Sequence, residues 1–258
     1  MSQERVERKP KADGSPKATR QRVDLLLVAR GVAESREQAQ TLIMEGLVFT
    51  TSGRVAKSSS LLPGKAELEV RGRLPYVGRG GLKLAHALDE FGLSLQGLVA
   101  LDLGASTGGF TDCLLQRGAK RVYAVDVGHG QLDYRLRQDA RVVVMEKRNA
   151  RYPFELPEPV DLVTIDVSFI SLKLVIPQAL GHLRAGRCLV ALVKPQFEAP
   201  RHDVGRGGVI KDPQVHAQVL AKAIVWTVDN GLRLRNLCAS PILGDAGNKE
   251  FFLLLQKT

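Results

Sequence analysis

The stretch Leu101-Asp102-Leu103-Gly104-Ala105-Ser106-Thr107-Gly108-Gly109-Phe110-Thr111 decides the fold of this 258-residue chain. Its apolar beginning predicts a buried strand, and its glycines predict a tight turn that leads into a helix. Four more short apolar runs follow, at residues 121–127, 141–145, 161–166 and 188–193, with helical patterns between them. This alternation predicts an α/β, Rossmann-like domain in which helices cover both faces of a mostly parallel sheet.

The rest of the chain is organised around this domain. Two more apolar runs, at 232–237 and 251–255, are expected to add an antiparallel strand at one edge of the sheet. Before the domain, two helical patterns and several short strand patterns predict a small α+β module. The predicted divisions are a basic disordered arm (1–21), the small module (22–70), a linker rich in Gly and Arg (71–81) and the sheet domain (82–258).

Composition and charge exclude several classes of protein. The chain has 37 Lys+Arg against 27 Asp+Glu, a formal net charge of +10, which favours a polyanion such as nucleic acid as partner. Cys113, Cys188 and Cys238 are too far apart for a disulfide framework, and the five histidines form no metal-binding motif, so no metal is expected. No apolar run approaches the roughly 18 residues of a membrane span, and no signal peptide is evident, so we expect a cytoplasmic protein.

The glycine turn and the end of the next strand together predict an adenosine-bearing cofactor. Asp126 stands about twenty residues after the turn, where a carboxylate can bind both hydroxyls of a ribose. The turn has neither the G-x-G-x-x-G spacing of dinucleotide sites nor the Lys-Ser/Thr of a P-loop. S-adenosylmethionine fits better, because it carries no phosphate. Asp102 is expected either to fix the turn or to meet the amino group of the cofactor.

Ionisable side chains stand at the ends of two predicted strands, where ligands of such sheets bind. Asp166 follows one apolar run and Lys194 follows another. Lys83 lies on the first helix of the domain and Glu250 precedes the last apolar run, and by spacing alone both are ordinary surface charges.

Several segments carry a resemblance that covers nearly everything after the arm. They are residues 22–57, 73–84, 102–111, 194–198 (Lys-Pro-Gln-Phe-Glu), 204–209 and 247–251 (Gly-Asn-Lys-Glu-Phe). Because it has these segments in this order, the chain resembles the TlyA family, also called hemolysin A, of ribosomal RNA 2′-O-methyltransferases. The joint occurrence of the segments is specific, whereas any single segment is not.

The resemblance implies an S4-like RNA-binding domain joined to an FtsJ-like class I methyltransferase domain. It implies a catalytic tetrad of Lys83, Asp166, Lys194 and Glu250. The cofactor-binding residues expected for S-adenosylmethionine are Asp102, Gly104, Ala105, Ser106, Thr107, Gly108, Gly109, Phe110, Asp126 and Asn149. The residues expected to bind RNA are Arg22, Arg36, Arg54, Lys57 and Arg79.

The implied reaction is attack of a ribose 2′-oxygen, of cytidine in 16S and/or 23S rRNA, on the sulfonium methyl. We expect Lys194 to accept the hydroxyl proton, with Lys83 as a second cation that weakens its hold on its own proton. The sequence leaves open whether Lys194 instead only orients the oxygen. Residues 201–211 are expected to form either a mobile lid or a plain surface loop.

Three other functions are considered. An RNA-binding protein with an inactive methyltransferase fold is the main alternative, and the intact tetrad disfavours it. A membrane-active toxin would need a long apolar or strongly amphipathic segment, which the sequence lacks. A dinucleotide-dependent oxidoreductase is disfavoured by the missing glycine pattern.

Overall fold

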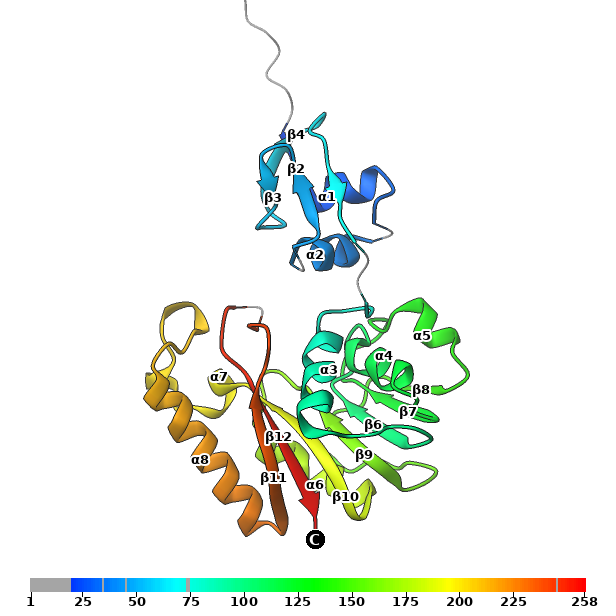
Figure 1. Cartoon of the computed structure of the whole chain (residues 1–258), viewed down its shortest axis with the longest axis vertical. Coiled ribbons are helices and arrows are strands. Elements are labelled where there is room, and N and C mark those ends of the chain that lie inside the picture. The colour runs from blue at the N-terminus through cyan, green and yellow to red at the C-terminus, as the bar shows by residue number, and fades with distance from the viewer. Residues whose placement is uncertain (1–19, 34, 45, 73–74, 245) are drawn as a thin grey trace, which may run out of the picture. The chain divides into compact units, whose positions relative to one another are not determined.

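The computed structural model describes residues 20–258 except 34, 45, 73–74 and 245, and it divides the chain into two compact units with the boundary between residues 73 and 74 (Figure 1). The arm predicted for residues 1–21 lies outside the described residues up to residue 19. In the described part of the chain, no helix has both the length and the apolar character needed to cross a membrane.

The first unit packs two short helices together and adds short strands. Val23, Leu26 and Leu27 bury one face of α1 (Val23–Ala29). The Ser35 hydroxyl accepts the backbone N–H of Gln38 at 3.1 Å, so the predicted cap begins α2 (Arg36–Met44). Two small antiparallel sheets, with strand orders β1-β4 and β3-β2-β5, accompany the helices. Their strands are β1 (Arg20–Arg22), β2 (Val48–Thr50), β3 (Gly53–Arg54), β4 (Leu61–Pro63) and β5 (Glu69–Val70).

The second unit is built on a seven-stranded sheet in the order β11-β12-β10-β9-β6-β7-β8. The five strands from β8 to β10 in this order pair in parallel, and β12 pairs antiparallel with both β10 and β11. The mostly parallel α/β sheet is therefore confirmed, with its antiparallel pair at one edge. The strands are β6 (Val99–Leu103), β7 (Arg121–Val125), β8 (Val142–Met145), β9 (Val160–Ile165), β10 (Leu183–Val193), β11 (Leu232–Ala239) and β12 (Phe251–Lys257).

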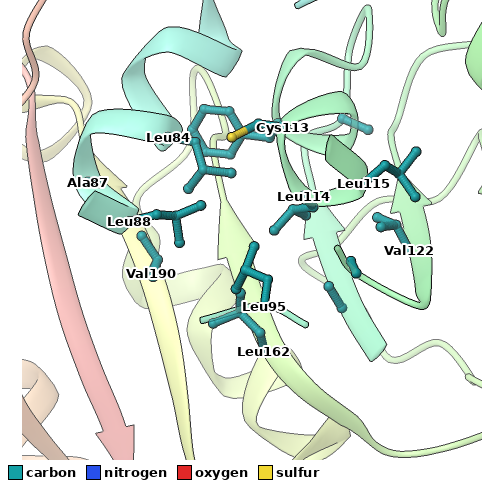
Figure 2. Close-up of a cluster of buried hydrophobic side chains, with 14 of the residues drawn as sticks. Leu84, Ala87, Leu88, Leu95, Cys113, Leu114, Leu115, Val122, Leu162 and Val190 are labelled. Atoms are coloured by element: carbon teal, nitrogen blue, oxygen red, sulfur yellow. The ribbon is translucent and has the colours of Figure 1, made fainter. Parts of the chain in front are cut away.

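Helices cover both faces of this sheet, because its strands alternate between two apolar cores. Ala100 of β6 belongs to one buried cluster and Leu101 to the other. Helices α3 (Gly80–Phe91), α4 (Gly109–Gln116) and α5 (Tyr134–Gln138) contribute to the first cluster, part of which Figure 2 shows. Helices α6 (Leu172–His182) and α8 (Pro213–Asp229) contribute to the second. Short helical turns, α7 (Pro195–Glu198), η1 (Arg201–Asp203) and η2 (Arg206–Gly208), lead from β10 to α8.

The structure differs from the expected pattern at two places. Residues 146–159, between β8 and β9, contain no helix. The predicted linker overlaps the second unit, because the side chains of Tyr76 and Val77 pack on its core and α3 already begins at Gly80. A Cβ on Gly81 would lie 2.3 Å from Cγ of Tyr76. Glycines that read as a flexible linker are thus required here for close packing.

Candidate active site

The glycine turn after β6 is shaped by contacts that a side chain would destroy. Gly104 has a φ of +87°, and a Cβ on it would lie 2.2 Å from the carbonyl oxygen of Asp166. Gly108, the N-cap of α4, has a φ of +99°, and a Cβ on it would lie 2.2 Å from Cδ1 of Leu136. Both positions combine a left-handed backbone with close approach, which only glycine tolerates. The turn is therefore a fixed cradle at the end of β6.

An open cavity of about 290 Å³ lies beside this turn, where β6, β7 and β9 end. The strand order reverses at this point of the sheet, with β7 on one side of β6 and β9 on the other, which is where ligands of such folds bind. Asp126 accepts the backbone N–H of Ser106 at 2.8 Å and that of Gly128 at 2.7 Å, so it joins the loops that follow β6 and β7.

Four of the predicted cofactor-binding residues line the cavity, namely Gly104, Ser106, Asp126 and Asn149. Ala105 and Phe110 are instead buried in the core, and the remaining residues of the turn do not line the cavity. Sequence reasoning missed most of the wall, because most of its residues in the loops after β7, β8 and β9 belong to no motif. Only their position after a strand signals them. The missed residues include Val127, Gly128, Gln131, Arg148, Arg151, Val167, Ser168 and Phe169.

Asp102 lies beneath the turn, not in the cavity wall. It is fully buried, and its carboxylate accepts the hydroxyls of Thr111 at 2.7 Å and Thr164 at 2.9 Å. Of the two expected roles, the geometry supports fixing the turn, because these bonds tie β6 to α4 and β9. Burial raises the pKa of Asp102 to about 7; the threonine hydroxyls oppose this shift, and the charges of Asp166 and Asp126 add to it.

Lys83 and Glu250 form a buried ion pair. The Lys83 ammonium lies 2.7 Å from Oε2 of Glu250, and the side chains are 7% and 3% exposed. A Cβ on Gly244 would lie 2.2 Å from Oε1 of Glu250, so the carboxylate fills the space that a side chain would need. The pair links α3 to the residue before β12, which are distant in sequence.

Lys194 and Asp166 form a second ion pair. The Lys194 ammonium lies 2.5 Å from Oδ1 of Asp166 and 3.0 Å from the hydroxyl oxygen of Ser168. Lys194 directly follows β10 and Asp166 directly follows the parallel strand β9. Both side chains are mostly buried, with 12% and 19% exposed. Sequence reasoning missed Ser168, which follows β9 by three residues and contacts Lys194 through the fold.

Strand register brings the two ion pairs to the same edge of the sheet. The pairing of β10 with β12 ends at Val193 and Phe251, and Lys194 and Glu250 are the next residues beyond that last pair. The four predicted catalytic residues are thus gathered as two pairs. Glu250 binds the ammonium of Lys83 and Asp166 binds that of Lys194, so each carboxylate can position one lysine. The effect of Lys83 as a second cation on Lys194 stays a prediction.

The loop that precedes α8 is fastened to the start of β12. Asn248 is 1% exposed, and its side chain accepts the backbone N–H of Ile210 at 2.9 Å and donates to the carbonyl of Gly208 at 2.8 Å. The His216 ring nitrogen lies 3.2 Å from the Ile210 carbonyl oxygen. Of the two expected roles for residues 201–211, these contacts favour a fixed surface loop over a mobile lid.

The residues predicted to bind RNA differ in their surroundings. Arg22 and Arg36 make ion pairs with the buried Asp24, at 2.8 and 3.0 Å. Arg54 and Lys57 are exposed in the same unit. Arg79 is instead the N-cap residue of α3 in the second unit. Two of the five are therefore part of an internal charge network.

Comparison with known proteins shows which family the chain is similar to. A family model described as FtsJ-like methyltransferase matches residues 76–257. The Mycobacterium tuberculosis protein named 16S/23S rRNA (cytidine-2′-O)-methyltransferase TlyA is 44% identical over 243 residues, 93% of this chain and 91% of that protein. Hemolysin A of Brachyspira hyodysenteriae is 42% identical over 236 residues, 89% of this chain and 97% of that protein. A solved structure from Streptococcus thermophilus has a TM-score of 0.74 at 45% identity, and the match covers 93% of this chain and 90% of that one.

The residues around the cavity fit S-adenosylmethionine. At Gly104 and Gly108 the turn has no room for a side chain, so a ligand can approach the backbone closely. Asp126 and Asp166 line the cavity, and the buried Asp102 lies beneath the turn, which suits a cationic ligand. The fold and the site define a Rossmann-like, S-adenosylmethionine-dependent methyltransferase. The chain belongs to the FtsJ-like methyltransferase family, in the group that includes TlyA and hemolysin A.

Proposed function

We propose that this protein transfers a methyl group from S-adenosylmethionine to a ribose 2′-hydroxyl of ribosomal RNA, at a cytidine of 16S and/or 23S rRNA. The observation that carries the proposal is the two lysine–carboxylate contacts, Lys83–Glu250 and Lys194–Asp166, together with the position of Asp166 in the cavity wall. The acceptor and its cytidine are taken from TlyA, which is 44% identical to this chain.

The contacts of the four residues support the roles that we propose for them. When bound, S-adenosylmethionine supplies a methyl group already activated on a sulfonium. In our proposal Lys194, held by Asp166 and Ser168, fixes the 2′-oxygen in line. To act as the base it first gives its own proton to solvent, and in its neutral form it then receives the hydroxyl proton. Lys83, held by Glu250, is placed to stabilise the negative charge that develops on that oxygen.

The first unit is proposed as an S4-like RNA-binding domain of residues 22–70, joined to the methyltransferase unit, which already includes Tyr76, Val77 and α3. Arg54 and Lys57 are exposed there and free to meet phosphates. Arg22 and Arg36 are partly exposed, at 36% and 49%, so they can contact RNA while they neutralise Asp24. The net charge of +10 supports a polyanionic partner.

The test is transfer of labelled methyl to purified ribosomal subunits and to free rRNA. With the wild type, label is expected at a site that resists alkaline cleavage, because a 2′-O-methyl group blocks that cleavage. Lys194→Ala should lower the rate roughly 10²–10⁴-fold. Lys222→Ala, an exposed lysine on α8, is the matched control and should match the wild type.

Two outcomes would contradict the proposal. Label in neither subunit nor in free rRNA would refute the acceptor. Binding of RNA without binding of S-adenosylmethionine, measured by calorimetry, would favour an RNA-binding protein with an inactive methyltransferase fold. Lys194→Arg then separates the two roles of Lys194: it keeps the charge but does not accept a proton, so activity retained in this variant means orientation alone.

A further inference from the structure

Asp102 is a buried acid without a cation. Its side chain is 0% exposed, and its hydrogen bonds come from two neutral hydroxyls, those of Thr111 and Thr164. Among the residues that the structure describes, no basic side chain contacts it. A buried carboxylate costs several kcal/mol unless a positive charge accompanies it. The fold therefore leaves this position short of one positive charge.

The ionisable groups around Asp102 do not supply that charge. Asp126 and Asp166 follow the strands on either side of β6, and both act on Asp102 as negative charges. Lys194 is paired with Asp166, and Lys83, on the helix packed against this face, is paired with Glu250. Arg148 and Arg151 line the cavity from the loop after β8, but they are exposed, so water screens their charge.

The charge of the ligand changes during the reaction. S-adenosylmethionine carries a positive sulfonium, whereas its product, S-adenosylhomocysteine, has a neutral sulfur and is otherwise the same apart from the lost methyl group. A site with excess negative charge distinguishes these two ligands by that charge alone. The cavity lies directly against the turn that Asp102 supports.

We propose that Asp102, with Asp126 and Asp166, makes the site prefer the cationic methyl donor over its neutral product, and that Asp102 releases a proton to solvent when the donor binds and takes one up from solvent when the sulfur loses its charge. The inference rests on the proposed methyl transfer. The proton of the acceptor hydroxyl is separate and leaves by way of Lys194.

The proton exchange affects ligand binding because Asp102 titrates near neutral pH. The pKa of Asp102 is raised to about 7, chiefly by burial, so both protonation states are populated under working conditions. A cationic ligand lowers this pKa, and by linkage the affinity for the donor rises as pH increases through 7. The affinity for the neutral product rises less. Each unit by which the pKa of Asp102 differs between the donor complex and the product complex corresponds to about a tenfold preference for the donor.

The experiment is calorimetry of both ligands on the full chain at pH 7, in buffers with different heats of ionisation. In the wild type, S-adenosylmethionine should release more protons than S-adenosylhomocysteine. Asp102→Asn should remove this difference and lower the preference for the donor by up to about tenfold. Both ligands carry an amino group that also titrates, so the difference between wild type and variant is the quantity that reports Asp102.

Asp161→Asn is the matched control. Asp161 is also a mostly buried carboxylate next to β6, but it stands at the opposite end of β9 and is bound by Arg184. This variant should exchange protons as the wild type does. If it instead loses the difference between the ligands, the effect is not specific to Asp102 and the proposal is overturned.

Other outcomes of these experiments also test the proposal for Asp102. Equal proton release by wild type and Asp102→Asn would overturn the proposal. If Asp102→Asn does not fold, carbon-13 NMR of the aspartate carboxyls in the wild type replaces it: one carboxyl should titrate near pH 7 with the product bound and stay ionised with the donor, and its absence would overturn the proposal. Failure of both ligands to bind would contradict the methyltransferase function itself.

Discussion

Among the residues that the structure describes, Asp24 in the first unit and Asp102 in the second are completely buried aspartates, and their charges are balanced in opposite ways. Asp24 of the first unit accepts hydrogen bonds from Arg22, Arg36 and Gln40, and these hold its pKa well below the usual range. Asp102 of the second unit has two threonine hydroxyls, and burial raises its pKa to about 7. The chain neutralises the first charge itself and leaves the second to a ligand. A buried acid thus supports the architecture in one unit and the function in the other.

The largest effect is expected from Asp24→Ala. Loss of the acid leaves two arginines without their partner and should lower the free energy of unfolding of the first unit by about 3 kcal/mol. Hydrogen exchange of the amides in α1 and α2 measures this. The fluorescence of Trp226, the single tryptophan, reports the second unit and should be unchanged. Unchanged exchange would mean that the arginines do not stabilise the unit through Asp24.

The contribution of Asp24 to the stability of the first unit depends on pH. Because the pKa of Asp24 is lowered on folding, its contribution to stability is present above about pH 4 and is lost as pH falls below that value. The first unit of the Asp24→Ala variant should lack this loss.

In the second unit, the contribution of Asp102 to stability should depend on pH in the opposite direction, and Asp102→Asn tests this. The pKa of Asp102 is raised on folding, so the native state holds a proton that the unfolded state loses near pH 4. Stability of the second unit therefore falls as pH rises from about 4 to 7 and levels off above that. The variant should lack this slope and exceed the wild type at pH 8 by roughly 1–3 kcal/mol, measured by urea unfolding with Trp226 fluorescence. Identical slopes would contradict an uncompensated charge.

Glu250 lies between Asp24 and Asp102 in this comparison. Like Asp24 it is neutralised by a cation of the chain, but that cation, Lys83, is also proposed to be catalytic. Gly244→Ala should push the Glu250 carboxylate away and move Lys83 with it. The rate of methyl transfer should fall by up to roughly 10²-fold while the affinity for S-adenosylmethionine is kept. Gly181→Ala, where an added Cβ has open space, is the control. A full rate in Gly244→Ala would remove the proposed role of this pair.

The smallest effect is expected from Thr164→Val, which removes one of the two hydroxyls that stabilise the charge of Asp102. The free energy of unfolding of the second unit should fall by about 1 kcal/mol, and the pKa of Asp102 should rise further. Thr227→Val is the matched control, because the Thr227 hydroxyl donates to a carbonyl within α8. Unfolding in urea at pH 8, where Asp102 is ionised, should separate the two variants. Equal losses in both would mean that the hydroxyl does not serve the charge.

Much of the fold could be predicted from local patterns. The apolar runs became strands within a few residues of their expected ends, and the Ser35 cap begins α2. The linker prediction was wrong at its C-terminal end, because Gly80 and Gly81 look flexible in sequence but are packed against the core. The absence of a helix at residues 146–159 was missed, since local patterns do not show that the chain passes from β8, at the edge of the sheet, to β9 on the other side of β7 and β6.

The sequence by itself determined the α/β alternation and the glycine turn, because periodicity and glycine geometry are local properties. The four ionisable residues came from the resemblance to a known family, since by spacing alone Lys83 and Glu250 are ordinary surface charges. Only the tertiary structure decided which lysine meets which acid, since that depends on the ends of β9, β10 and β12 coming to one edge of the sheet. It also decided that Arg22 and Arg36 neutralise Asp24 while Asp102 meets only threonines. The charge balance of a buried group depends on neighbours that are distant along the chain, and packing alone brings them together.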